Sequence, residues 1–82
     1  MKVKKTVQRL DPQARRLVTG LAKRLRRLRD EQGWTLEDCE THGFKNWRHL
    51  QEIESGKNIT LETLTKVARL YRIHPSELLK GL

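Results

Sequence analysis

The sequence is short of the residues that build disulfides, metal centres and catalytic sites. Its 82 positions include one cysteine, Cys39, which excludes an internal disulfide and a multi-cysteine metal site. The histidines at positions 42, 49 and 74 have no CxxC or HxxxH partner nearby, so we expect no metal and no other cofactor. No nucleophile–base pair and no phosphate-cradling glycine loop is visible either. We therefore do not expect an enzyme, and no small-molecule substrate is evident.

Long apolar runs are also lacking. Lys and Arg interrupt the first apolar residues every few positions, which fits neither a signal peptide nor a membrane-spanning helix. We therefore expect a soluble, cytoplasmic protein with no membrane partner. A chain of this length allows one domain, and it buries only about 60% of the surface that it exposes when unfolded.

Charge is abundant but unevenly distributed. The formal net charge is +8, which indicates an anionic partner, with nucleic acid as the first candidate. Residues 1–29 hold eleven Lys or Arg against one Asp, whereas residues 30–56 hold two basic residues against seven acidic ones. The strongest positive charge therefore lies outside the middle of the chain.

The chain is predicted to begin with a basic arm at residues 1–12, followed by one helical domain at residues 13–82. Asp11 as N-cap and Pro12 at the first helical position start a helix that ends near Gln32-Gly33. Gly20 interrupts it, which leaves a later start or a bend as alternatives. The expected inward-facing residues are Leu17, Leu21, Leu25 and Leu28.

Four shorter helices are predicted to follow. Thr35 with Asp38 resembles a capping box, Asn46 and Thr60 are N-caps, and Pro75 starts the last helix. The spacing of apolar residues predicts that the following side chains face inward: Leu50, Ile53, Leu61, Leu64, Val67, Ala68, Tyr71, Leu78 and Leu79. With no β-type alternation, the predicted fold is a compact, all-α domain of five helices.

An ordered set of motifs in this chain resembles the lambda-repressor/Cro-like, or XRE, helix-turn-helix family. The set comprises Leu28-Arg29, Gly33-Trp34-Thr35, Ile53-Glu54-x-Gly56 and the helix pair LETL…VA…Y-x-I-x-P-x-E-LL at residues 61–79. The resemblance covers about residues 20–80 and places a helix-turn-helix at about residues 35–55. It implies that the third helix lies in the major groove of double-stranded DNA.

Four residues of that third helix are then the candidates for reading bases: Trp47, Arg48, Glu52 and Gln51. Arg48 can donate two hydrogen bonds to guanine, and Glu52 can accept from cytosine N4 or orient Arg48. Trp47 can pack against a thymine methyl or a sugar. The alternatives are that Trp47 is a core or interface residue and that Arg48 and Glu52 are ordinary surface charges.

Phosphate contacts are expected around this helix. The candidates are the side chains of Lys45, Asn46, Lys57 and Asn58 and the backbone N–H groups near Leu36 and Leu61, at the starts of the second and fourth helices. Lysines and Arg9 of the arm can add contacts along the DNA backbone or in the minor groove. The resemblance also implies a structural ion pair between Arg29 and Glu54.

The chain departs from the family pattern in the predicted helix-turn-helix. Cys39 takes the place of a core leucine, which indicates a buried thiol. Glu40 replaces a small residue, so it must point outward or displace a helix. Gly43 lies one position before the usual turn glycine, whose place Phe44 takes, so we expect a turn rebuilt around Gly43. Phe44 then either covers the core or is exposed.

The sequence thus favours a transcriptional regulator that binds a palindromic operator as a homodimer. The dimer surface is expected in the last helix, with Leu78, Leu79 and Leu82, at Phe44, or in the arm. Antitoxins, restriction-modification controllers and phage repressors all use modules of this size. The alternative is a helix-turn-helix fold that serves as a protein-interaction module.

Overall fold

A computed structural model describes residues 10–82 and places five α-helices within them. The helices are α1 (Pro12–Gln32), α2 (Leu36–Thr41), α3 (Trp47–Glu54), α4 (Leu61–Leu70) and α5 (Pro75–Leu79). No strand occurs in this range, so the predicted all-α class is confirmed. Residues 1–9, which make up most of the predicted basic arm, lie outside the described part of the chain.

The helix starts lie where the capping residues predicted them. Asp11 accepts a hydrogen bond from Gln13 N at 2.9 Å. Thr35 and Asp38 form a reciprocal capping box, with distances of 3.0 and 2.8 Å. Thr60 caps α4 through its hydroxyl. These side chains satisfy N–H groups that have no partner inside the helix, which explains why short local motifs fix the helix boundaries.

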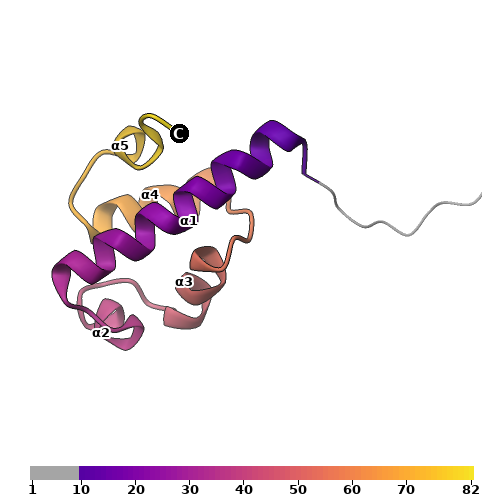
Figure 1. Ribbon diagram of the computed structural model, residues 1–82. Coiled ribbons are helices and arrows are strands. Elements are labelled where there is room, and N and C mark those ends of the chain that lie inside the picture. The colour runs from indigo at the N-terminus through magenta and orange to yellow at the C-terminus, as the bar shows by residue number, and fades with distance from the viewer. Residues whose placement is uncertain (1–9) are drawn as a thin grey trace, which may run out of the picture.

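The helices enclose one hydrophobic core. Figure 1 shows α1 running across the molecule, with α2 and α3 on one side of it and α5 on the other. Direct packing joins α1 to α3, α1 to α5, α2 to α3 and α4 to α5. The largest fully buried side chains are Leu25, Leu50, Ile53, Leu78, Val67 and Cys39. Each helix pair thus contributes to a core that holds α3 against α1.

Two predicted core residues are in fact exposed. Leu17 on α1 is 36% exposed and Leu61, the first residue of α4, is 79% exposed. Both have the expected periodicity, but each lies toward the start of its helix, outside the core cluster. They border a small apolar hollow of about 170 Å³ together with the buried Leu21 and Leu64. Periodicity gives the face of a helix and not the length over which that face is covered.

The C-terminal end packs against the middle of α1. A Cβ at Gly20 would lie 2.9 Å from a methyl of Leu82, so the glycine permits this close approach. One turn later, Arg24 Nη1 donates to the backbone oxygens of Leu78 at 3.1 Å and Lys80 at 2.6 Å. The helix α1 begins at Pro12, as predicted, and continues through Gly20, which excludes the alternative of a later start.

Candidate nucleic-acid interface

Helix α3 divides into a buried face and an exposed face. Leu50 and Ile53 are 0% and 1% exposed and lie in the core, as predicted. Arg48, Gln51 and Glu52 are exposed. Since Arg48 and Glu52 are four residues apart, they lie on the same side of the helix, one turn from each other. The exposed face therefore presents one basic, one amide and one acidic side chain.

The first turn of α3 is held by two side chains. Asn46 Oδ1 accepts from Arg48 N at 3.1 Å and from His49 N at 3.2 Å, which confirms Asn46 as the N-cap. Glu40 of α2 accepts from Trp47 N at 3.2 Å. A carboxylate is favourable at this positive end of a helix. Glu40 therefore points outward, one of the two alternatives expected for it, and ties α2 to the start of α3.

Trp47 and Arg48 contact each other. The guanidinium carbon of Arg48 lies 5.4 Å from the centroid of the Trp47 ring, a cation–π distance. Trp47 is half-buried. It is therefore not a fully buried core residue, and part of its ring stays accessible to a partner. Arg48 itself is exposed, so the contact lies at the surface of α3.

The turn between α2 and α3 is built around Gly43. Its φ of 115° lies in a region that favours glycine, as predicted from the displaced position. Phe44 follows with its N–H donating to Cys39 O at 2.9 Å, and its ring is 7% exposed. Phe44 therefore covers the core, and the alternative of an exposed apolar residue is excluded.

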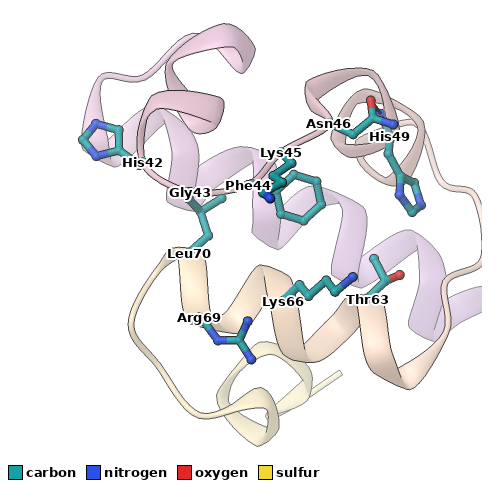
Figure 2. A pocket seen from close by; sticks show the side chains of 10 residues that line it. All are labelled: His42, Gly43, Phe44, Lys45, Asn46, His49, Thr63, Lys66, Arg69 and Leu70. Carbon is teal, nitrogen blue, oxygen red and sulfur yellow. Dashed lines mark hydrogen bonds between the residues drawn. The ribbon is translucent and has the colours of Figure 1, made fainter.

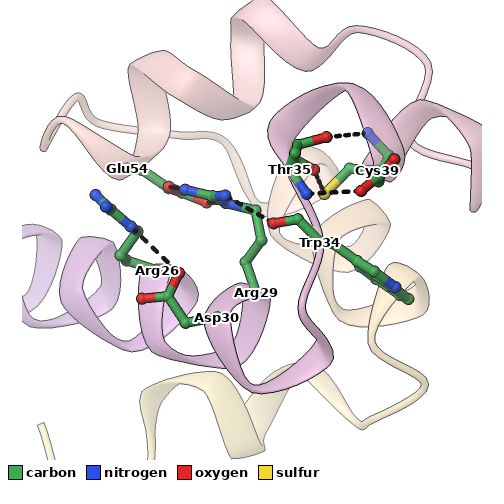
Figure 3. Close-up of polar contacts among 8 residues, drawn as sticks. Arg26, Arg29, Asp30, Trp34, Thr35, Cys39 and Glu54 are labelled. Atoms are coloured by element: carbon green, nitrogen blue, oxygen red, sulfur yellow. Dashed lines mark hydrogen bonds and ion pairs between the residues drawn. The ribbon is translucent and has the colours of Figure 1, made fainter.

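Arg29 and Glu54 form the predicted ion pair, which joins α1 to α3 (Figure 3). Arg29 Nε and Nη2 each donate to one carboxylate oxygen of Glu54 at 2.8 Å. Arg29 Nη1 also donates to Trp34 O at 2.9 Å. Hydrogen bonding to Glu54 raises the pKa of Arg29 above its ordinary value. Both side chains are nearly buried, at 11% and 6% exposed, so this pair positions α3 and does not face solvent.

An aromatic cluster beside α2 was missed by the sequence reasoning. Trp34 stacks on His42 with ring centroids 3.9 Å apart and on Tyr71 at 5.8 Å. The Tyr71 hydroxyl is buried beside the Cys39 thiol, with no oxygen or nitrogen partner among the described residues, and burial raises the pKa of Tyr71. Cys39 is fully buried, as predicted, and burial likewise raises the pKa of its thiol. Tyr71 is distant in sequence from Trp34 and His42, so no local motif indicates that the three rings stack.

The predicted phosphate-binding residues lie in separate places. Lys45 and Asn46 border a hollow between the α2–α3 turn and α4. Asn58 and Leu61 border the apolar hollow near α1 instead, and Asn58 Oδ1 accepts from Ile59 N at 3.0 Å. The remaining two candidates are the exposed Lys57, just after α3, and the half-buried Leu36, at the start of α2.

The hollow between the α2–α3 turn and α4 has a volume of about 450 Å³. Besides Lys45, its borders include Lys66 and Arg69 of α4 and His49 of α3 (Figure 2). Its lining contains no Asp or Glu. The α4 residues were not predicted as site residues, because their spacing reads as the solvent face of an amphipathic helix.

Comparison with profiles of known protein families and with curated proteins finds no match for this chain. Among residues 10–82, no group of three His, Cys, Asp or Glu gathers in a way that could hold a metal ion. None of the five helices is long and apolar enough to cross a membrane.

Proposed function

We propose that this chain is a sequence-specific DNA-binding transcriptional regulator of the lambda-repressor-like helix-turn-helix type, with α3 in the major groove. The observation that carries the proposal is the exposed face of α3, with Arg48, Gln51 and Glu52 held outward while Leu50 and Ile53 pack in the core. A rigid helix with polar side chains on its outer face matches what the major groove admits and what base edges require.

Arg48 is the principal base-reading residue in this proposal. Its guanidinium can donate two parallel hydrogen bonds to O6 and N7 of guanine, and it lies beside the Trp47 ring. Glu52 accepts from cytosine N4 or orients Arg48. Gln51 lies at the margin of this face.

Basic residues outside α3 supply the positive charge that binding to the DNA backbone requires. Residues 30–56 hold seven acidic residues against two basic ones, so most of the affinity must come from basic residues outside this range. Lys45 and Lys57 are exposed on either side of α3, and α1 carries a series of exposed basic residues. The basic residues at positions 2, 4, 5 and 9 supply further charge.

We expect two copies of the chain to bind DNA together as a homodimer, because one such module has limited sequence specificity. Two copies on half-sites about one helical turn apart would double the number of bases read. Phe44 and Leu78 are buried in the core, so a dimer interface at the C-terminal end has to use Leu79 and Leu82. Leu82 is 43% exposed.

Selection of bound sites from a random duplex pool tests the proposal directly. We expect a palindromic consensus, and we expect Arg48→Ala to relax the preference at one position of each half-site. A lost bidentate contact of about 1–3 kcal/mol corresponds to roughly 5- to 150-fold weaker binding of the preferred duplex. Arg27→Ala, which removes an exposed positive charge from α1, is the matched control and should leave the preference unchanged.

If the selected pool shows no consensus, α3 does not read bases. The exposed acidic residues Glu37, Glu40 and Glu52 would then favour the second candidate, a protein-interaction module that binds a basic partner. Co-purification from a lysate with Glu37→Gln/Glu52→Gln as the control variant would test that function. Glu40 is kept in this variant because it caps α3.

A further inference from the structure

The hollow between the α2–α3 turn and α4 gathers positive charge in one place. Lys45 approaches it from the turn, and Lys66 and Arg69 lie one turn apart on α4. Among residues 10–82, the one ion pair made by these three is Lys66–Glu62 at 3.7 Å, between side chains that are 56% and 80% exposed. The attraction within an ion pair this exposed is weak. Because no Asp or Glu lines the hollow, its three cations favour an anion that enters it.

The lining also offers neutral hydrogen-bonding groups and an apolar floor. Figure 2 shows the Phe44 ring between the turn and α4, with Thr63 and Lys66 on α4 and the His49 ring extending toward α4. Phe44 and His49 rings are in tilted contact, with centroids 6.4 Å apart. The N–H groups of Trp47, Arg48 and His49 are engaged by Glu40 and Asn46, so an anion in the hollow does not bind these three groups.

The size of the hollow restricts the class of ligand. Its volume of about 450 Å³ lies within the range of roughly 300–1,000 Å³ that is usual for small-molecule sites. Inorganic phosphate alone would leave most of this space empty. A phosphate group on a nucleotide-sized body would place its charge among the cations and its ring over the apolar floor.

We propose that this basic hollow binds a phosphate group carried by a nucleotide, with Lys45, Lys66 and Arg69 as its cationic contacts. The nucleotide is either free or part of a DNA strand. The site borders α3 but does not include its exposed reading face, so it stands whether or not Arg48 reads bases. Occupancy would fix Lys45 and the α2–α3 turn, and with them the start of α3.

The test uses adenosine monophosphate as the free probe, followed by backbone amide shifts or calorimetry at constant ionic strength. Adenosine, which lacks the phosphate, is the matched ligand. The variant Lys66→Gln/Arg69→Gln removes two cations from the hollow, and Lys23→Gln/Arg27→Gln removes the same two residue types from α1. Lys45→Gln repeats the test without altering α4. Thermal unfolding checks that each variant folds.

We expect the monophosphate to bind the unaltered chain and adenosine to bind at least tenfold more weakly. The hollow variant should also lose at least tenfold in affinity for the monophosphate, because two charge-assisted contacts are removed, whereas the α1 variant should keep its affinity. This pattern supports a free nucleotide as the source of the phosphate.

Binding to duplex DNA tests the second source, a phosphate group of the DNA backbone. If a DNA phosphate occupies the hollow, the hollow variant should weaken binding to all sequences more than the α1 variant does. Its slope of log affinity against log salt should also fall by about two. If the hollow and α1 variants behave alike with both the monophosphate and the duplex, the proposed site is wrong. Arg48→Ala should change the sequence preference for DNA without changing the affinity for the monophosphate. The test therefore distinguishes failure of base reading by α3 from failure of the proposed phosphate site.

Discussion

Removal of the charge on Glu54 should destabilise this protein more than any other change that conserves side-chain shape. In Glu54→Gln, Arg29 loses one of its two carboxylate acceptors and the compensating negative charge. Water cannot easily replace them, because the side chains of Arg29 and Glu54 are only 11% and 6% exposed. Breaking a buried pair by removing one partner costs about 3–5 kcal/mol. Since Gln retains one acceptor, we expect a loss at the lower end, about 3 kcal/mol.

That loss is a large part of the total stability. A domain of this length has a free energy of unfolding of roughly 4–12 kcal/mol. With a urea m-value of about 1 kcal/mol/M, the midpoint should fall by about 3 M. Urea unfolding followed by circular dichroism measures this shift.

The control is the exposed pair between Arg26 and Asp30, which lies at 3.6 Å with side chains 63% and 62% exposed. Asp30→Asn should cost less than about 1 kcal/mol. The double variant Arg29→Met/Glu54→Leu should be more stable than Glu54→Gln, because no unpaired charge is left in the interior. A residual cost of about 1 kcal/mol is expected from Trp34 O, which loses its donor. If Glu54→Gln and Asp30→Asn cost the same, the buried pair does not hold α3 as argued.

Three further predictions follow from the buried and capping groups. Tyr71→Phe should change the free energy of unfolding by less than about 1 kcal/mol, because the buried hydroxyl that it removes has only the weakly hydrogen-bonding Cys39 thiol beside it. Thermal unfolding measures this, and a larger loss would contradict it. Cys39 should resist alkylation in the folded protein, because it is fully buried and burial raises the pKa of its thiol, and it should react at the rate of a free thiol in urea. Mass spectrometry over time measures the labelling. Rapid labelling of the folded protein would contradict this prediction. Hydrogen bonds from Thr35 lower the pKa of Asp38, so its contribution to stability is complete above the unfolded value of about 4 and is lost as pH falls through the lower folded value. Asp38→Asn should therefore show a shallower fall in stability below pH 4, and identical acid unfolding curves would exclude this cause.

Local motifs explain why the helix starts were predictable. Asp11, Thr35, Asn46 and Thr60 cap their helices through side chains that reach N–H groups only two or three residues ahead. Such interactions depend on the neighbouring residues alone. The same holds for the turn at Gly43, whose positive φ follows from the residue type.

The candidate site was only partly predictable. The face of α3 that carries Arg48 and Glu52 follows from periodicity, once Leu50 and Ile53 are taken as buried. The role of Glu40 at the start of α3 depends on how α2 is placed, and no spacing rule indicates it. Whether this face reads DNA stays a prediction.

The sequence by itself determined the number of helices, their starts and the inward face of each, because these depend on interactions within a few residues. Only the tertiary structure decided how far each face is covered, which leaves Leu61 exposed while Phe44 closes the core. It also brought Lys45 beside Lys66 and Arg69 around one hollow. Contacts of this kind join residues that are distant along the chain, and their geometry follows from how the helices pack rather than from the order of the residues.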